Sequence, residues 1–326
     1  MRKIPISSIF LLILFFAPGN LYAQSVKNEA EFAHPRGIIK SEDLFLIRER
    51  IRTEPYKSWY HKIESTTIEA EMTVDRNNPY QVIFLAQKQA QLYVLTDDFH
   101  WANKTWETLQ IALNDSDYFN NPISRGLTRA TQLFGTAMCY DFCYNAWSYR
   151  QRKIVANKLF EVMISVNSNM GHSANYALES NWNGVRWGSV LFASLVYDDF
   201  EQSTKHSQSL PFTWDTQKRL QNHIGKNIYP GGWNAESLSY FVYNWSFVGP
   251  AIIALQNSNS SAAFYLSNFA PNALNAIHGW STSTVSIKHP AGKGIQPDLS
   301  DDDPQADYML TSIGLRLFPK EQIPAI

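Results

Sequence analysis

Residues 179–189 (ESNWNGVRWGS) and 231–247 (GGWNAESLSYFVYNWSF) each place amide and aromatic side chains at the start of an apolar stretch. After Asn183, apolar residues recur at every third or fourth position, which predicts an amphipathic helix. The second stretch carries four side chains at spacings that place them on one helical face. They are Glu236, Tyr240, Tyr243 and Phe247. We therefore expect two helices whose first turns carry amide and phenol groups, and we expect these groups to face one cleft.

The same helical periodicity extends outward from these stretches. Signals for a helix start precede further apolar stripes along the chain. They lie at Ser41, Pro55, Asn78 and Asp98, and long apolar runs cover residues 127–147 and 148–167. Almost no stretch alternates apolar and polar residues as a half-buried strand does. We expect an all-α fold of antiparallel helix pairs in a curved or closed (α/α) toroid, because no exact repeat period indicates a regular solenoid.

Two features limit the predicted helices in the second half of the chain. Residues 220–228 predict only a short helix between the two marker stretches. Gly249–Pro250 is expected to stop or kink the helix that begins near residue 235, because proline removes a backbone donor. Further helical pieces are then expected over residues 251–256 and 262–277.

The first 23 residues have the features of a secretory signal peptide. Arg2 and Lys3 form a basic start, Ile9–Ala17 is a short apolar run, and Ala23 is a small residue at the expected cleavage point. A retained membrane anchor is the alternative, but the apolar run is too short to span a bilayer. We expect a leader over 1–23, a flexible segment over 24–33 and one domain over 34–326, exported to the periplasm or beyond and not bound to a membrane.

The charge of the chain excludes a general attraction to polyanions. The 326 residues carry a formal charge of −1, which becomes −3 when Arg2 and Lys3 leave with the signal peptide. Nucleic acid and anionic lipid are therefore not expected partners, and an acidic ligand must be held by local groups. Cys139 and Cys143 lie four positions apart, a spacing that seldom meets disulfide geometry, so two buried thiols are expected. No cofactor motif or helical zinc motif is present, and we expect neither.

Two further motifs join the marker stretches in a fixed order: HPRG (34–37) followed by SEDLFLIRERI (41–51), and ATQLFGTAMCYDFCYNAWSYRQRKIV (130–155). Together, over nearly all of residues 34–320, they resemble the heparinase II/III-like and alginate-lyase-like polysaccharide lyases. The resemblance implies an (α/α) toroid that cleaves uronic-acid polysaccharides by β-elimination. It also implies a following β-sandwich domain with a further catalytic histidine. Since the sequence stops at Ile326, we expect an incomplete toroid without that sandwich.

The resemblance also implies roles for single residues. In that family an Asn, sometimes with a His, neutralises the substrate carboxylate, and a Tyr exchanges protons; these roles fall on Asn181 and Tyr243. Trp182 stands where several relatives have His. The residue types suit this chemistry, because an amide donor stabilises a developing enolate and one tyrosine can act as base and acid. Tyr240 is the second candidate for the chemistry, and with Glu236 it is expected to orient Tyr243 or the sugar.

Further substrate contacts are expected from amide, cationic and aromatic side chains near the two clusters. They are Asn183, Trp182, Arg186, His172 and Trp233. Each candidate has a structural alternative: Asn181 or Asn183 can cap a helix, and the tyrosines and tryptophans can pack in a core. A stripe of one Glu and two Tyr is costly to bury without polar partners, which favours the site.

Two other functions stay open on the sequence. A glycoside hydrolase on a helical toroid needs two carboxylic acids across the scissile bond. Glu236 with either Asp141 or Glu179 is the available choice, and neither pair stands out. A non-catalytic glycan-binding protein, or a truncated lyase remnant, would use the same clusters for binding alone. In each case the expected partner is a polysaccharide, and for the lyase it is an acidic one whose identity the sequence does not select.

Overall fold

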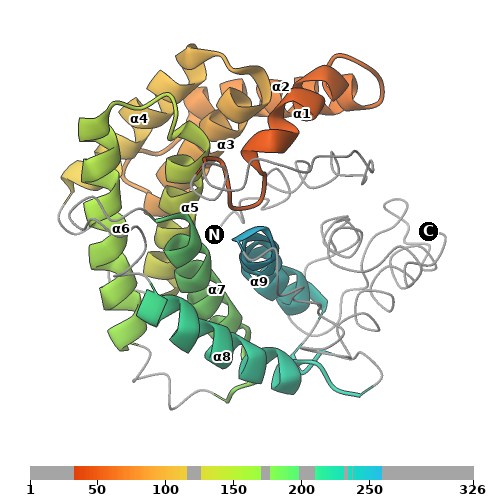
Figure 1. Cartoon of the computed structure of the whole chain (residues 1–326), viewed down its shortest axis with the longest axis vertical. Coiled ribbons are helices and arrows are strands. Elements are labelled where there is room, and N and C mark those ends of the chain that lie inside the picture. Colours follow the sequence, from red (N-terminus) through yellow and green to blue (C-terminus); the bar gives the residue numbers. More distant parts are fainter. Residues whose placement is uncertain are drawn as a thin grey trace.

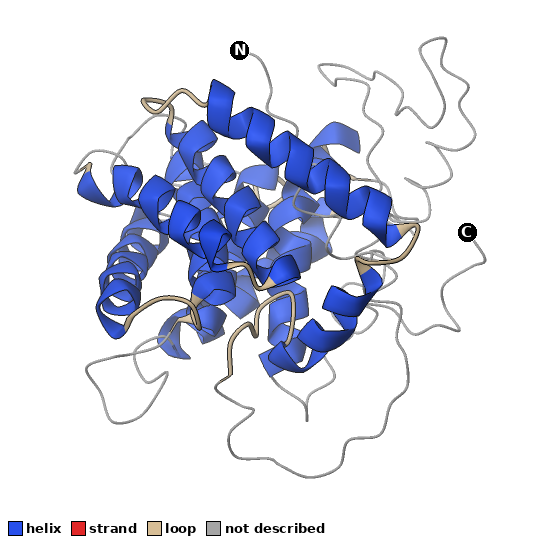
Figure 2. Cartoon of the chain, turned by 90° about the horizontal axis from the view of Figure 1, so that it is seen from above, coloured by secondary structure: helices blue, strands red, loops and turns tan. Residues whose placement is uncertain are grey.

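The computed structural model describes residues 33–115, 126–169, 177–197, 210–230, 234–236 and 238–258, without the side chains of 168–169, 210–211 and 238–239. Within these residues helices dominate, and no strand forms beyond one isolated bridge between Ile228 and Asn234 (Figure 2). The predicted all-α class is therefore confirmed. The leader, the segment 24–32 and the predicted helix over 262–277 lie outside the described residues.

The described residues form nine α-helices, labelled in Figure 1. They are α1 (Leu44–Arg50, after a 3₁₀ turn over Ser41–Asp43), α2 (Tyr56–Thr73), α3 (Pro79–Thr96), α4 (Phe99–Asn114), α5 (Leu127–Cys143), α6 (Tyr149–Asn169), α7 (Asn181–Val196), α8 (Leu210–Asn227) and α9 (Leu238–Ser258). In Figure 1, α4, α6 and α8 follow one another along the outside of a curve, and α9 lies on its inner side.

Side-chain caps fix the starts of α3 and α4 where the sequence predicts them. The Asn78 side chain accepts from the backbone N–H groups of Tyr80 and Gln81, and Pro79 occupies the first turn, where its missing N–H costs no helical bond. Asp97 ends α3 in the left-handed region at φ 64°. Asp98 then accepts from the backbone of α4 and begins the next helix.

Helices α3 and α5 run in the same direction. Near their first turns, the hydroxyl groups of Tyr80 and Thr128 lie 2.7 Å apart. Farther along both helices, the side chain of Gln87 donates to the sulfur of Met138. Contacts that advance together along two helices require a parallel arrangement.

Helices α7 and α9 continue this parallel row. Gly126, at φ 88° just before α5, lies beside the guanidinium group of Arg186 on α7, and the rings of Phe134 and Phe192 meet farther along at 4.9 Å. The α7–α9 contacts follow the same order: Gly184 against Asn244, then Gly188 against Phe247. We call α3, α5, α7 and α9 the inner row; all four N-termini lie at one end of it and all four C-termini at the other.

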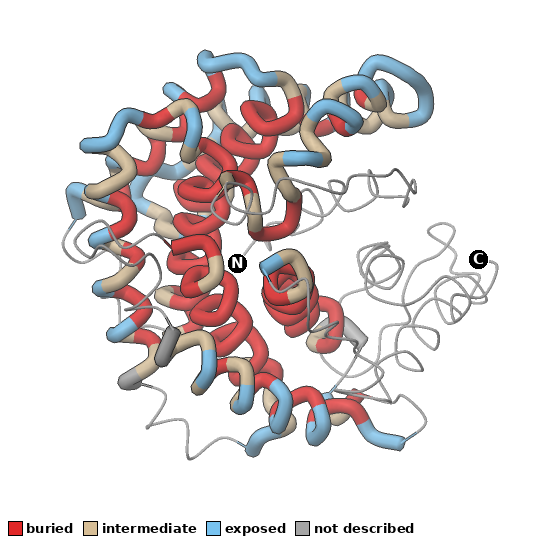
Figure 3. The backbone as a smooth tube through the Cα atoms, viewed as in Figure 1, coloured by how far each residue is buried: buried red, intermediate tan, exposed pale blue. Residues whose placement is uncertain are grey.

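The outer helices return the chain in the opposite direction. Tyr93 near the end of α3 meets Phe99 at the start of α4, whereas Gln89 earlier in α3 accepts from Thr108 later in α4. The pairs α5–α6 and α7–α8 are antiparallel in the same way, as the sequence predicts: Arg129 early in α5 donates to Ser165 late in α6, and Ser194 late in α7 meets Thr213 early in α8. The inner row is buried almost all round (Figure 3), and α3 buries the polar residues Gln87, Lys88, Gln89 and Gln91 as well as apolar ones.

Two predicted helix bounds are wrong: helix α5 ends at Cys143 rather than near Trp147, and α8 begins at Leu210, ten residues before the predicted start. Of the predicted stop or kink at Gly249–Pro250, the stop does not occur, because helix α9 passes through Pro250 without ending. Proline inside a helix costs about 3 kcal/mol. Residues 251–254 of α9 are fully buried, and full burial of even one large aliphatic side chain contributes about 1.5–3 kcal/mol, so packing outweighs the local preference.

Candidate functional site

The two marker clusters meet at the N-terminal end of the inner row. Asn181 is the first residue of α7, and Glu236 lies just before α9. The Oε2 atom of Glu236 accepts a hydrogen bond from the backbone N–H of Asn181 at 2.7 Å. A carboxylate is favourable at this point because the first N–H groups of a helix have no partner within it and carry partial positive charge. Clusters that are 55 residues apart in sequence are thus in direct contact.

Neither predicted asparagine caps α7. That position belongs to Ser180, whose hydroxyl accepts from the N–H of Trp182. Asn181 is 2 % exposed and Asn183 is 1 % exposed, and among the described residues no group donates to the Oδ1 atom of either side chain. The Nδ2 atom of Asn183 donates to the carbonyl of Ala177. Buried polar atoms without partners are costly, so these two oxygens in one helical turn are candidates for contact with a ligand.

Arg186 brings a positive charge into the same region. Arg186 is 4 % exposed, and its guanidinium carbon lies 5.8 Å from the centre of the Trp182 ring. The same guanidinium group lies beside Gly126 at the start of α5. Arg186 thus points into the protein, and the half-buried ring of Trp182 lies beside its guanidinium group.

Tyr243 lies on α9, two turns after Glu236. Its residue is half-buried, and the edge of its ring meets Phe247 at 5.7 Å. Burial raises the pKa of the Tyr243 hydroxyl, the neighbouring Tyr80 adds to this, and a polar contact with Thr131 acts in the opposite direction. The hydroxyl is therefore protonated at neutral pH. Tyr240, one turn earlier on α9, is also half-buried.

A buried polar network, which the sequence did not predict, lies behind these residues. His223 on α8 is fully buried, and burial lowers its pKa. Its ring contacts the carbonyl of Leu178 and the side chain of Asn244, and Asn227 and Asn234 extend the contacts. The signal that was present in the sequence is the four-residue spacing of His223 and Asn227 in a helical run, which places both on one face.

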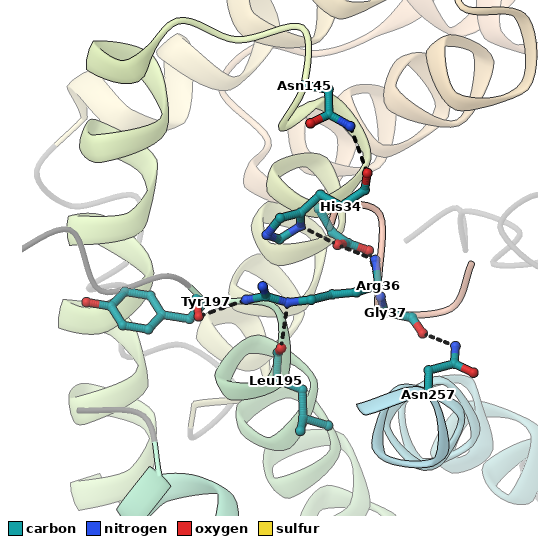
Figure 4. Close-up of polar contacts among 8 residues, drawn as sticks. His34, Arg36, Gly37, Asn145, Leu195, Tyr197 and Asn257 are labelled. Atoms are coloured by element: carbon teal, nitrogen blue, oxygen red, sulfur yellow. Dashed lines mark hydrogen bonds and ion pairs between the residues drawn. The ribbon is translucent and has the colours of Figure 1, made fainter. Parts of the chain in front are cut away.

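Other predicted residues lie elsewhere. His172 and Trp233 fall outside the described residues. Asp141 is fully buried near the C-terminal end of the inner row, where its two oxygens accept from the His34 ring and from the backbone N–H groups of Arg36 and Gly37 (Figure 4). This carboxylate is therefore saturated and far along α5 from the marker clusters, and it does not form an acid pair with Glu236.

The N-terminal end of the inner row favours negative charge. The N-termini of its four helices lie here, and each helix dipole contributes a partial charge of about +0.5. At α3 and α7 the first N–H groups are already bonded, to Asn78, Ser180 and Glu236. A depression of about 620 Å³ lies elsewhere, between α1, α2 and the end of α3. An open cleft at Asn181 and Tyr243 thus stays a prediction, whereas their position on one end of two adjoining helices is observed.

Comparisons with known proteins leave the family of the chain open: no protein-family model matches it, and a search of curated proteins finds no significant match. Cys139 and Cys143 are buried free thiols, as expected. Within the described ranges, no three His, Cys, Asp or Glu side chains gather as metal ligands would. In the same ranges no helix combines the length and the apolar character needed to cross a bilayer.

Proposed function

We propose that this protein is an exported polysaccharide lyase, or the helical domain of one, that cleaves a uronic-acid polymer by β-elimination. The reacting sugar is bound at the N-terminal end of the inner row, and the antiparallel pairs are one side of an (α/α) toroid. Support comes from the meeting of the two marker clusters and from the parallel inner helices paired with antiparallel outer ones.

One observation carries the proposal: the buried Asn181 side chain has an Oδ1 atom without a partner among the described residues, at the end where four helix N-termini converge. A half-turn about the Cβ–Cγ bond exchanges the oxygen and the NH₂ group, so this side chain can present a donor to a bound carboxylate. Arg186 and the helix ends strengthen the attraction for negative charge. The same groups stabilise the enolate that forms when C5 of the uronate loses its proton.

The two proton transfers in β-elimination define a role for Tyr243. In β-elimination a base takes the C5 proton, the C4–O bond breaks, a C4=C5 double bond forms, and the leaving oxygen gains a proton. A tyrosine whose pKa is raised is protonated at neutral pH, so Tyr243 suits the donation to the leaving oxygen. The base is then Tyr240 or Glu236, both on the approach to Tyr243.

The decisive experiment follows the ultraviolet absorbance of the unsaturated product while the full chain is mixed in turn with alginate, hyaluronan and heparan sulfate. Tyr243→Phe keeps the ring and removes the hydroxyl, and it should lower turnover about 10²- to 10⁴-fold. Asn181→Ala should lower turnover about 10²- to 10³-fold, as the loss of one oxyanion donor does elsewhere. Tyr149→Phe, at an exposed residue of α6, is the matched control and should be neutral.

Other outcomes would assign the chemistry to other residues or favour another function. Parental turnover in Tyr243→Phe would remove Tyr243 from the chemistry, and Tyr240→Phe and Glu236→Gln would then be compared. Binding of a uronate polymer without product would favour the non-catalytic glycan-binding alternative, which uses the same amide groups. Absence of both binding and product would overturn the proposal. In the hydrolase alternative Asp141 cannot be one of the two catalytic acids, because its carboxylate is buried and bonded to His34, Arg36 and Gly37 (Figure 4).

A further inference from the structure

A continuous buried hydrogen-bond network joins α8 to both arms of the candidate site. We define the arms as residues 177–180, which lead into α7, and residues 234–236, which lead toward α9. His223 contacts the carbonyl of Leu178 through Nδ1 at 2.6 Å, and its Nε2 lies 3.0 Å from Nδ2 of Asn244. Asn227, one turn after His223 on α8, donates through Nδ2 to the carbonyl of Glu179. The first arm is thus held at two consecutive carbonyl groups.

The second arm is held by the same asparagine. Asn227 Oδ1 accepts from the side chains of Asn234 at 2.7 Å and of Asn244 at 3.2 Å. The backbone carbonyl of Asn227 accepts from the N–H of Ala235 at 2.8 Å, and Asn234 Oδ1 accepts from the N–H of Glu236 at 2.9 Å. One residue on α8 therefore fixes the geometry of both arms, and through them the contact between Glu236 and Asn181.

The hydrogen-bond partners of His223 determine which of its two ring nitrogens carries the proton. A carbonyl oxygen only accepts, so Nδ1 must carry the proton and donate to Leu178. In the neutral ring Nε2 then has a lone pair, and the Asn244 NH₂ group donates to it. A proton on Nε2 would have Oδ1 of Asn244 as an acceptor at 3.2 Å, but it would place a positive charge in a fully buried site whose direct partners are an uncharged carbonyl and an amide. Gly184 lies so close to Asn244 that little room exists for the amide to rearrange around this charge.

We propose that His223, acting through Asn227 and Asn244, is a positioning residue that holds the two arms of the candidate site in one arrangement, and that protonation of His223 releases them. The coupling of the arms stands on the hydrogen bonds alone. Its effect on a substrate rests on the proposed function. His223 touches no substrate in this scheme, since it lies behind the arms and is fully buried.

Few charges face His223 among the described residues. Burial opposes the protonated ring most strongly, whereas the hydrogen bonds to Leu178 and Asn244 and then the carboxylate of Glu179 favour it, and the net result is a lowered pKa. Helix α7 presents Gly184 and the ring of Trp187, and α9 presents Asn244, none of which titrates. On α8 itself, Arg219 and Lys226 lie within one turn by sequence, and Arg219 is paired with Asp215. Release is thus expected below the ordinary His range.

The test measures hydrogen exchange at the backbone N–H of Asn181, which is bonded to Glu236, in the full chain and without any substrate. His223→Leu removes the donor and the acceptor together and should accelerate this exchange about 10- to 100-fold. His223→Gln retains one donor and one acceptor but does not titrate, so it should restore most of the protection. Thr216→Val is the matched control, because the hydroxyl of buried Thr216 on the same helix donates to carbonyls of α8 itself.

A pH series separates positioning from a merely structural role. In the parent chain the protection of Asn181, corrected for intrinsic exchange, should fall as the solution is acidified below neutrality, and in His223→Gln it should fall less. Equal pH profiles in the two proteins would overturn the proposal. So would equal acceleration in Thr216→Val and His223→Leu at matched loss of stability. If His223→Leu does not fold, the comparison of the parent with His223→Gln decides. An inactive parent with these exchange results would refute the lyase proposal and leave the coupling intact.

Discussion

The two ends of the inner row use polar groups in opposite ways. At the C-terminal end, a buried carboxylate has both oxygens occupied, and the segment 34–37 is bonded to three helices (Figure 4). At the N-terminal end, the Oδ1 atoms of Asn181 and Asn183 are buried without a partner among the described residues. A carboxylate whose oxygens are bonded in this way stabilises the fold, and a buried acceptor without a partner is a group that a ligand can satisfy. On this contrast between Asp141 and Asn181 we propose a structural role for the first and a binding role for the second.

The C-terminal end is closed by the segment HPRG, residues 34–37. The Arg36 side chain donates to the carbonyls of Leu195 and Tyr197 at the end of α7, where the helix dipole favours a cation. Asn257 at the end of α9 donates to the carbonyl of Gly37. The His34 ring stacks on Tyr144 with centres 3.9 Å apart. These contacts make His34 a structural residue of this end.

The largest effect is expected from Asp141→Ala. The substitution leaves three buried donors without an acceptor, those of His34, Arg36 and Gly37. Removing one partner of a buried charged cluster costs about 3–5 kcal/mol, which should appear as a lower free energy of unfolding in urea. Asp215→Ala, in an exposed pair with Arg219, should cost less than about 0.5 kcal/mol. Similar losses for the two variants would contradict the view that the C-terminal end is the structural one.

Two glycine substitutions should have opposite signs. A Cβ atom on Gly184 would meet the Asn244 side chain and lie 2.9 Å from Nε2 of His223, so Gly184→Ala should destabilise the chain by about 1–3 kcal/mol. No described atom lies within 4 Å of a Cβ on Gly225, which is exposed on α8. Gly225→Ala should therefore stabilise the helix by about 0.5–1 kcal/mol. Thermal unfolding of both variants checks the prediction, and equal signs would refute it.

A pair of asparagine variants compares the two ends directly. Asn257→Ala removes a donor to the buried carbonyl of Gly37 and should cost about 1–2 kcal/mol. Asn181→Ala removes a buried oxygen that has no partner among the described residues, so it should lower the free energy of unfolding by less than about 0.5 kcal/mol. This smaller loss is expected although Asn181 is more buried than Asn257. Chemical unfolding of both proteins measures the contrast. A larger loss for Asn181→Ala would show that this side chain is structural.

The smallest effect is a dependence of stability on pH. Because burial lowers the folded-state pKa of His223, the unfolded chain binds this proton first as the pH falls below the ordinary value of 6.5. Stability from this group is therefore complete above pH 6.5 and is lost between that value and the lowered pKa, by at most about 1.4 kcal/mol per pH unit. The difference in unfolding free energy between the parent and His223→Gln, followed from about pH 7.5 to about pH 5, isolates the contribution. A difference that does not vary with pH would contradict it.

The sequence predicted those features that short-range chemistry determines. Asn78 and Asp98 begin helices as expected, because a side-chain oxygen and its helix are neighbours in the chain. Pro250 shows the limit of such signals, since tertiary burial keeps α9 continuous where local preference predicts an end or a kink.

The site was predicted in part for the same reason. Tyr240, Tyr243 and Phe247 lie on α9 at the expected helical spacing, whereas Glu236 lies before the first residue of α9 and is wrongly predicted to share that helical face. The contact of Glu236 with Asn181 fits the expected meeting of the clusters. The roles of His223 and Asn244 do not follow from spacing, because their bonds depend on how α8 and α9 pack. Likewise, the assignment of Ser180 rather than Asn181 as the cap depends on a one-residue difference in the start of α7.

The parallel direction of the inner helices affects where the sequence can change without loss of the fold. Each connection that enters an inner helix arrives at the same end, so insertions and substitutions in these connections accumulate around one face. Each connection that leaves an inner helix departs from the other end, where the segment 34–37 bonds to α5, α7 and α9. A chain of this design can acquire a new ligand by altering its entering connections while the leaving end preserves the fold.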